Sequence, residues 1–189
     1  MPKALLVIDM QKEGVYNSYS PRTGSKESMY NKDKVISNIK KLIKAFNTRK
    51  QKVIQVKVWI TDPKKTSMTK VYPGEGLANK PGSEIIEELA NEHFDYIVKK
   101  THYSAFWKTN LDAILKKNKI KQVYLTGINT GFCVFCTALD AFYRGYDVFL
   151  VEDATSTVAG KAFHKRDVEQ FTWFCGKNVI STTTLIKSL

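Results

Sequence analysis

The chain of 189 residues holds 30 lysine and arginine residues against 18 aspartate and glutamate residues, a formal net charge of +12. Its length suits one domain, and 43% hydrophobic with 25% charged residues is typical of globular proteins. No apolar stretch reaches the roughly 20 residues of a membrane-spanning helix, and Asp9 interrupts the first apolar run too early for a signal peptide. We therefore expect a single domain over residues 1–189, located in the cytoplasm.

The excess of positive charge is spread along the chain. Most lysines fall on the polar faces or at the ends of predicted helices, and no alternating basic and aromatic run is present. Such runs are typical of proteins that follow a nucleic-acid strand. We expect a solvated basic surface, with neither nucleic acid nor a membrane as partner. Contact with nucleic acid, or attraction of an anionic substrate, is the alternative.

Predicted strands and helices alternate along the chain. Apolar runs predict strands at residues 3–8, 52–59, 95–99, 121–125, 147–151 and 178–180. Helical spacing of apolar residues predicts helices at residues 33–49, 107–117 and 163–174 and a helix that begins near residue 132, while Ser83 is suited to cap a short helix. This alternation predicts right-handed βαβ units, and therefore an α/β fold whose doubly wound parallel sheet is covered on both faces.

Two long segments, residues 11–31 and 61–82, show neither the apolar runs of strands nor the apolar spacing of helices. The first is rich in serine and tyrosine, and the second holds most of the prolines. Long irregular loops in a compact domain usually carry function. Because each follows the carboxyl end of a predicted strand, we expect these two loops to determine specificity.

Three residues of suitable chemistry follow the ends of predicted strands: Asp9, Lys100 and Cys133. The carboxyl ends of parallel strands meet at one edge of the sheet, where ligands bind. Cys133 also lies at a predicted helix start, where unpaired N–H groups and the helix dipole favour an anion. We therefore predict that Cys133 is a nucleophile with a pKa below that of free cysteine. Lys100 would favour its thiolate, and Asp9 would accept the proton.

Four blocks in order support this interpretation: Val7-Ile-Asp9-Met-Gln11, Lys100-Thr-His-Tyr-Ser-Ala-Phe106, Gly127-Ile-Asn-Thr-Gly-Phe-Cys133-Val134 with Thr137-Ala-Leu-Asp-Ala141, and Val151-Glu-Asp153-Ala. Together they resemble the isochorismatase-like cysteine hydrolases, a family that includes nicotinamidases and N-carbamoylsarcosine amidases. The resemblance runs from about residue 4 to about residue 153, with a weaker tail to the end of the chain.

The resemblance implies a three-layer fold with six mostly parallel strands and a catalytic triad of Asp9, Lys100 and Cys133. It also implies a cis peptide bond between Ile128 and Asn129, with the N–H groups of Asn129 and Cys133 forming an oxyanion hole. A small-molecule substrate and a homo-oligomer are further implications.

Departures from the family pattern narrow the function. Nicotinamidases bind a metal through an Asp-x-His pair and a further histidine after the second strand. Here that region reads Trp59-Ile-Thr-Asp-Pro63, without a histidine. Asp62 alone falls short of the three or four ligands of a metal site, so we predict no metal and no cofactor, although the sequence leaves a part for Asp62 open. The intact Cys133 favours amide hydrolysis over the enol-ether chemistry of isochorismatases.

Aromatic residues are frequent in and beside the two loops. The set is Tyr16, Tyr19, Tyr30, Trp59, Tyr72, Phe106 and Trp107. Each could serve packing alone, but together they could form the wall of a substrate pocket. We name Tyr16, Trp59, Phe106, Phe132 and His102 as candidates for substrate binding; His102 stands where the family often has arginine.

The sequence therefore predicts a metal-independent cysteine hydrolase that cleaves a C–N bond of a small amide or ureide through a thioester. The alternatives are an isochorismatase- or nicotinamidase-type hydrolase and a binding member of the family without turnover. Cys133 and Cys136 also form a C-x-x-C pair, for which redox or zinc chemistry is a rival interpretation. We expect structural roles for Cys175 and His164, and a surface position for His93.

Overall fold

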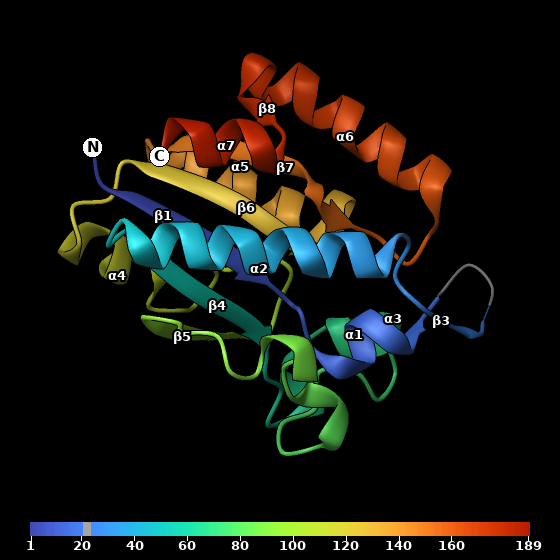
Figure 1. Ribbon diagram of the computed structural model, residues 1–189. Coiled ribbons are helices and arrows are strands. Elements are labelled where there is room, and N and C mark those ends of the chain that lie inside the picture. Colours follow the sequence, from blue (N-terminus) through green and yellow to red (C-terminus); the bar gives the residue numbers. More distant parts are fainter. Residues whose placement is uncertain (21–23) are drawn as a thin grey trace.

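A parallel sheet of six strands forms the centre of the computed structural model, which describes residues 1–20 and 24–189 (Figure 1). The strands are β1 (Lys3–Ile8), β4 (Lys52–Val58), β5 (Tyr96–Lys100), β6 (Gln122–Ile128), β7 (Asp147–Ser156) and β8 (Val179–Ile180). They pair in the order β5-β4-β1-β6-β7-β8, and every pairing is parallel. The predicted α/β fold with a doubly wound sheet is confirmed.

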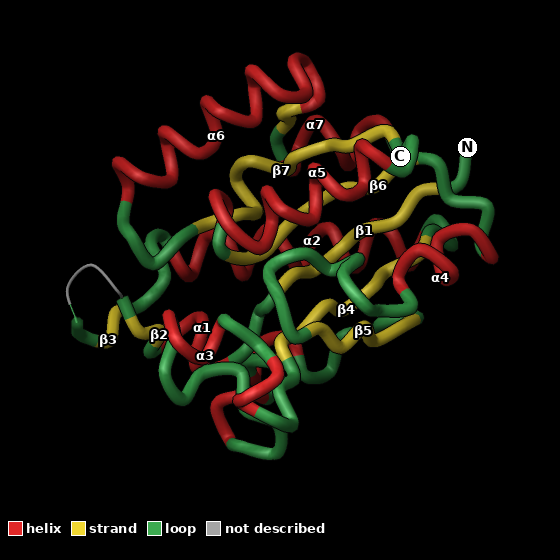
Figure 2. The backbone as a smooth tube through the Cα atoms, turned by 180° about the vertical axis from the view of Figure 1, so that it is seen from behind, coloured by secondary structure: helices red, strands yellow, loops and turns green. Residues whose placement is uncertain are grey.

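Helices cover both faces of this sheet. Helices α2 (Lys32–Thr48) and α7 (Thr182–Ser188) pack on one face, with α2 across the front in Figure 1. Helices α4 (Leu111–Lys117), α5 (Phe135–Tyr143) and α6 (Lys161–Cys175) cover the other face, which Figure 2 shows from behind. The result is three layers with a separate apolar core on each side of the sheet.

Strand β1 lies in the middle of the sheet and is apolar because it is buried on both faces. Leu5 and Val7 belong to the core beneath α2, whereas Ala4, Leu6 and Ile8 belong to the core beneath α4 and α5. The alternation follows from the two-residue period of a strand. Strand β1 therefore sets the position of whatever follows its carboxyl end.

The two long loops contain short elements that periodicity does not reveal. The first holds α1 (Lys12–Tyr16) and a small antiparallel pair, β2 (Ser18–Tyr19) and β3 (Lys26–Glu27). Residues 21–23 of this predicted loop lie outside the described residues. The second loop holds α3 (Met68–Val71) with 3-10 turns at Pro63–Lys65 and Pro81–Ser83.

Several predicted boundaries were wrong for local reasons. Ser83 does not cap a helix: it ends a 3-10 turn, and its hydroxyl donates to the Lys80 carbonyl at 2.7 Å. Helix α4 begins at Leu111 rather than at residue 107, because Lys108 has a φ of +51°, which a right-handed helix does not allow. Strand β7 is five residues longer than predicted, and α7 was not predicted.

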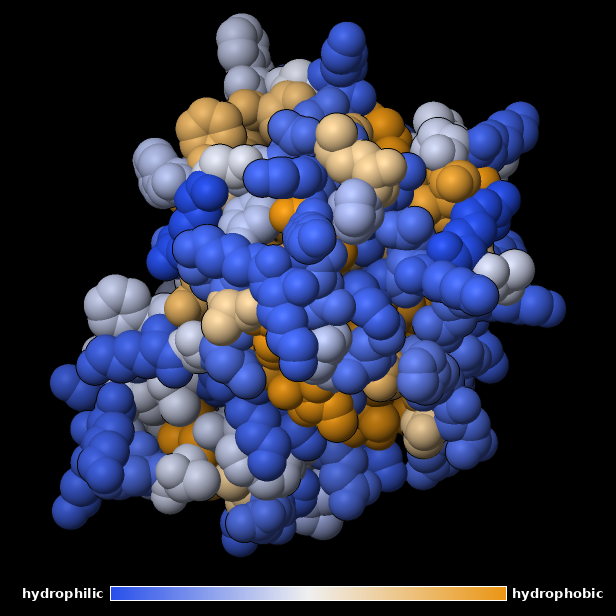
Figure 3. All heavy atoms as spheres, turned by 90° about the vertical axis from the view of Figure 1, so that its left-hand side faces the viewer, coloured by the Kyte–Doolittle hydropathy of each residue, from blue (hydrophilic) through white to orange (hydrophobic). Residues whose placement is uncertain are grey.

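Both termini lie on the left-hand side of the molecule in Figure 1. Hydrophilic side chains cover most of this face, with small apolar areas between them (Figure 3). Among the described helices, none combines the length and the apolar character that crossing a membrane requires.

Gly127 is required where β6 passes β1. It has a φ of +99°, and a Cβ atom built on it would lie 2.0 Å from the Ile8 carbonyl oxygen. We predict that Gly127→Ala lowers the free energy of unfolding by at least about 3 kcal/mol, because an unfavourable φ adds to a backbone clash. Urea denaturation measures this loss.

Gly145→Ala is the matched control. Gly145 also has a positive φ, +80°, but a Cβ atom there would have no atom within 4 Å. That substitution should cost only about 1–2 kcal/mol. Equal losses in the two variants would contradict the close approach of β6 to β1.

Candidate active site

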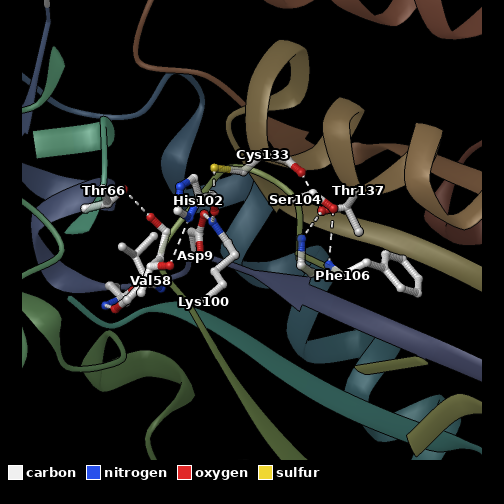
Figure 4. A network of polar contacts seen from close by, with 12 residues as sticks. Asp9, Val58, Thr66, Lys100, His102, Ser104, Phe106, Cys133 and Thr137 are labelled. Atoms are coloured by element: carbon white, nitrogen blue, oxygen red, sulfur yellow. Dashed lines mark hydrogen bonds and ion pairs between the residues drawn. The ribbon is translucent and has the colours of Figure 1, made fainter. Parts of the chain in front are cut away.

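Asp9, Lys100 and Cys133 meet at the carboxyl edge of the sheet (Figure 4). Asp9 follows β1 directly, and Lys100 is the last residue of β5. Cys133 lies in a π-helical turn, Thr130–Val134, which joins β6 to α5. All three residues are buried, with exposed fractions of 7%, 1% and 6%. The structure thus brings together the three residues that the sequence singled out.

The Lys100 ammonium group contacts both other side chains. Its Nζ lies 2.8 Å from Asp9 Oδ2 and 3.2 Å from Cys133 Sγ, and it donates to the His102 carbonyl oxygen at 3.1 Å. An ammonium group has three N–H donors. Each therefore has a partner, and the cation holds the carboxylate and the thiol at fixed positions.

The electrostatics of the thiol differ from the sequence prediction. Burial raises the pKa of Cys133, the Asp9 carboxylate raises it further, and Lys100 opposes both. The prediction of a pKa below that of free cysteine was wrong, because it counted the helix end and the cation but not desolvation or the carboxylate. Burial alone would lower the pKa of Lys100, but Asp9 and Cys133 outweigh it and raise it. The resting site is therefore a neutral thiol beside an ion pair.

One oxygen of Asp9 is left over. Oδ2 is paired with Lys100, whereas the buried Oδ1 has no hydrogen-bond partner among the described residues. A buried acceptor without a partner costs about 1–3 kcal/mol, so it needs an explanation. Asp9 lines the cavity beside Cys133, and Oδ1 has the free lone pairs that a proton acceptor needs.

The turn before Cys133 is held from several directions. The Ile128–Asn129 peptide bond is cis. The Asn129 carbonyl accepts the N–H groups of Phe132 and Val134 at 3.0 and 3.2 Å, and its Oδ1 accepts the Val158 N–H group at 3.0 Å. The Asn129 N–H group itself has no acceptor among the described residues. Asn129 and Cys133 both line the cavity.

The segment after Lys100 is fastened to α5. The Thr137 hydroxyl donates to the Cys133 carbonyl at 2.6 Å and accepts the Ala105 N–H group at 3.0 Å (Figure 4). The Ser104 hydroxyl donates to Asp140 Oδ2 at 2.5 Å. These bonds connect the ends of β5 and β6, which are not neighbours in the sheet, and so fix Lys100 relative to Cys133.

Gln11 connects the two long loops through hydrogen bonds. Its amide nitrogen donates to the carbonyl groups of Val58 and Ser83 at 3.0 and 2.8 Å, and its oxygen accepts the Val58 N–H group at 2.8 Å. One buried amide thus ties the first loop to β4 and to the end of the second loop.

A small cavity of about 60 Å³ opens beside Cys133. Besides Asp9 and Cys133, it is lined by Gln11, Glu13, Gly14, Ser18, Val58, Met68, Tyr72, Glu75, Gly76, Tyr103, Ile128, Asn129 and Phe132. Phe132, predicted to approach the substrate, is on this wall, and its ring packs against Tyr103 with centroids 5.8 Å apart. The walls come from both long loops and from the carboxyl ends of β1, β4 and β6.

Four predicted substrate-binding residues do not line the cavity. Tyr16 points outward, where its hydroxyl donates to Glu88 at 2.5 Å. Trp59 is covered by Lys57 and Lys99, whose Nζ atoms lie 4.1 and 4.4 Å from its ring.

Phe106 and His102 are likewise used elsewhere. Phe106 is 5% exposed and stacks on Tyr146 in the core. The His102 ring contacts Thr101 at 2.9 Å and lies beside Trp107, so that only its backbone carbonyl reaches Lys100. Proximity in the sequence to the strand ends did not reveal where these side chains point.

Other wall residues could not be recognised from the sequence pattern. Met68, Tyr103, Glu13 and Glu75 were not proposed, and Tyr72 appeared only within the aromatic set. Loop length was the available signal, because it marked both loops as functional without selecting side chains. The approach of Glu13 and Glu75 depends on the folding of one loop against the other.

The residues after β4 do not fit a nicotinamidase-type metal site. Asp62, the one acidic residue there, accepts the Lys64 N–H group at 3.0 Å and lies 3.5 Å from Lys65 Nζ. Its carboxylate therefore caps the 3-10 turn that follows. Within the described residues, no group of three or more histidine, cysteine, aspartate or glutamate side chains could hold a metal ion.

The remaining cysteines and His164 lie away from this chemistry. Cys133, Cys136 and Cys175 are all free thiols. Cys136 and Cys175 do not line the cavity, and the Cys175 thiol contacts the Phe171 carbonyl within α6. His164 contacts the Thr130 hydroxyl at 3.1 Å and so supports the turn before Cys133. Burial lowers the pKa of His164.

The family model of the Isochorismatase domain matches residues 3–184 of this chain. The chain belongs to the isochorismatase family. The resemblance seen in the four sequence blocks is thereby confirmed. The members of this family described below are named as hydrolases, which places this chain in a family of enzymes.

Solved structures of other family members share the whole fold. An isochorismatase-like hydrolase from Alkaliphilus metalliredigens is 26% identical, with a TM-score of 0.85 over 100% of this chain and 99% of that one. An N-carbamoylsarcosine amidase from Thermoplasma acidophilum is 30% identical, with a TM-score of 0.78 over 96% and 97%.

A relative found by sequence comparison is also named for its activity. A ureidoacrylate amidohydrolase of Variovorax paradoxus is 38% identical over 93 residues, which are 49% of this chain and 37% of that protein. The match thus spans little more than a third of that relative's length.

The raised pKa of Cys133 gives a first prediction for this isochorismatase-family site. Alkylation by iodoacetamide should show an inflection above the roughly 8.5 of free cysteine, because burial and Asp9 both disfavour the thiolate. Asp9→Asn should move the inflection to lower pH, since it removes the negative charge and leaves Lys100. Peptide mass spectrometry at a series of pH values measures both.

Cys175 is the internal control, because burial raises its pKa to about 11 and Asp9 is not among the causes. Its inflection should be the same in both proteins. A Cys133 inflection below that of free cysteine, or one that Asp9→Asn leaves in place, would contradict the electrostatics described above.

Proposed function

We propose that the protein is a cysteine hydrolase that cleaves the C–N bond of a small amide or ureide, without a metal, through a thioester on Cys133. The observation that carries the proposal is the contact of one buried ammonium group with both a carboxylate and a thiol at the edge of a cavity. Burial removes the hydration of both charges, and this cost can exceed the gain from their attraction. A chemical role gives a reason for keeping such a pair.

The first half of the reaction is the attack on the carbonyl carbon. Asp9 accepts the thiol proton on its free oxygen, and Lys100 stabilises the thiolate that forms. The thiolate then adds to the carbonyl carbon of the substrate. The N–H groups of Asn129 and Cys133 stabilise the developing oxyanion, a contribution that is worth about 10²–10³ in rate for one such donor elsewhere.

The second half releases the two products. Protonated Asp9 gives its proton to the leaving nitrogen, the C–N bond breaks, and ammonia or an amine departs. Asp9 then takes a proton from water, which attacks the thioester; the C–S bond breaks, the acid leaves, and Asp9 returns the proton to the Cys133 thiolate. The same carboxylate thus acts twice as base and twice as acid, and the neutral thiol is restored. The raised pKa of Cys133 agrees with this cycle, because the proton leaves the thiol only when a substrate is there to be attacked.

Two alternative activities of the family fit the site less well. A nicotinamidase-type reaction with a bound metal lacks ligands here, since Asp62 caps a turn and has no histidine beside it. Hydrolysis of an enol ether does not need a thiol, so it gives no reason for the Lys100–Cys133 contact. We also retain, as proposals, a small-molecule substrate, a cytoplasmic location and a homo-oligomer.

Replacement of the nucleophile is the direct test. Cys133→Ala should reduce the release of ammonia from a substrate found in an amide and ureide screen by at least about 10³-fold, because no other group can form the acyl intermediate. Asp9→Asn should be similarly inactive. Steady-state rates with circular dichroism of each variant separate lost chemistry from lost folding.

Cys136→Ala is the matched control. It removes a thiol three residues away that does not line the cavity, so its rate should stay within about twofold of the parent. A Cys133→Ala variant as active as the parent would rule out the proposed mechanism, and an inactive Cys136→Ala variant would favour dithiol chemistry.

A further inference from the structure

The wall of the cavity has a sign of charge opposite to that of the whole protein. Its ionisable lining residues are three carboxyl groups and two tyrosines next to Cys133, and no lysine, arginine or histidine belongs to the described lining. With Lys100 included, which pairs with Asp9, the site holds three carboxyl groups and one ammonium group. The protein as a whole carries a formal charge of +12, so this local excess of negative charge has to be explained by the site.

Glu13 and Glu75 supply that excess and come from different loops. Glu13 lies on α1, and its Oε1 accepts the Gly76 N–H group of the second loop at 2.5 Å. Glu75 lies in the second loop and accepts the Tyr19 N–H group and, at 3.3 Å, the Ser18 hydroxyl of the first. The two carboxylates therefore have fixed places, because each is bound by the backbone of the opposite loop.

Packing holds Glu13 further. A Cβ atom on Gly82 would lie 2.8 Å from Glu13 Oε2, so the carboxylate rests against the backbone of the turn at Pro81–Ser83. One oxygen of Glu13, Oε1, is hydrogen-bonded to the second loop, and the other, Oε2, receives no hydrogen bond from the described residues.

The two carboxylates are poorly compensated. Burial raises the pKa of Glu13 and of Glu75 and outweighs the backbone hydrogen bonds from Gly76 and Tyr19, which lower it. The nearness of Glu13 raises the pKa of Glu75 further. Lys26 lowers both pKa values, but it lies on β3 and is not part of the wall. A ligand group with positive charge and N–H donors would compensate the negative charge of Glu13 and Glu75, which no cation of the described lining compensates.

We propose that Glu13 and Glu75 determine specificity: they select an amide or ureide whose end opposite the scissile bond carries a cationic amino or amidinium group, and they disfavour a carboxylate there. The proposal rests on the function proposed above. Ureidoacrylate, for which one relative is named, is an anion. The proposed selectivity therefore differs from the one that this name suggests.

The alternative role of the two glutamates is only to hold the loops together. Glutamine separates the roles, because it keeps an acceptor oxygen for the N–H groups and removes only the charge. Glu13→Gln and Glu75→Gln are therefore the informative variants. Glu169→Gln on the exposed side of α6 is the control, since it changes the net charge equally and lies outside the cavity.

Matched compounds make the test independent of turnover. Binding is measured by calorimetry on the Cys133→Ala protein with β-alaninamide, butyramide and succinamate, and with the ureides 2-aminoethylurea, propylurea and 3-ureidopropionate. Within each set the free end is cationic, neutral or anionic at nearly constant size. The cationic compound should bind at least about tenfold more tightly than the anionic one, because one charged hydrogen bond is worth about that factor.

The variants decide between selection and structure. Glu13→Gln and Glu75→Gln should each reduce the preference for the cationic compound about tenfold, with neutral compounds and melting temperature unchanged, while Glu169→Gln keeps the parent preference. Equal or tighter binding of the anionic compound, no measurable binding of the cationic ones, or an unchanged preference in both glutamine variants would overturn the proposal.

Release of ammonia by the protein with Cys133 intact tests the proposed function separately. Charge-selective binding without release from any of the six compounds would support the selectivity and count against the hydrolase mechanism. Release of ammonia without a charge preference in binding would support the hydrolase mechanism and contradict the proposed selectivity.

Discussion

The buried ammonium group of Lys100 is the constraint on which the rest of the site depends. A cation with 1% exposure is stable only if every one of its donors has a partner. Its partners are the Asp9 carboxylate, the Cys133 thiol and the His102 carbonyl. Removing the Asp9 carboxylate would leave the ammonium charge buried and unpaired, whereas removing the Cys133 thiol would leave one of its N–H donors without a partner. The three residues therefore depend on one another in stability as well as in chemistry.

The scaffold makes this constraint geometrically achievable. The three side chains come from β1, β5 and the turn after β6, and β4 separates β1 from β5. The long lysine side chain spans that separation, which a shorter cation could not do. Gly127 lets β6 approach the end of β1, and the bonds of Thr137 connect the segment after β5 to the turn before α5. Distant parts of the chain thus contribute to one fixed arrangement.

The fold and the three central residues could be predicted because they depend on local pattern. Apolar runs with helices between them specify a parallel sheet, and the ends of parallel strands share one edge, so Asp9, Lys100 and Cys133 were placed together without knowledge of distances. Four of the five predicted substrate-binding residues could not be placed in this way. Trp59, for example, is beside the strand end in sequence, but Lys57 and Lys99 cover its ring.

The direction of the Cys133 pKa shift could not be predicted from the sequence pattern. The same physical reason applies to the roles proposed for Glu13 and Glu75. Each depends on how much water is excluded and on which charges are near, and both follow from how the loops pack. The helix start that favours a thiolate is visible in the sequence, whereas the burial that opposes it is not. The reciprocal bonds between the two loops likewise join residues about 60 positions apart.

The central claim, that Cys133 forms a covalent bond to the acyl group, is tested most directly by rapid quenching during turnover followed by intact and peptide mass spectrometry. The account predicts an added mass equal to the acyl group on the peptide that contains Cys133, absent from Cys136 and Cys175 and removed by hydroxylamine. Full release of ammonia with Cys133 unmodified at every time point, under conditions in which the second step is slowed, would contradict it.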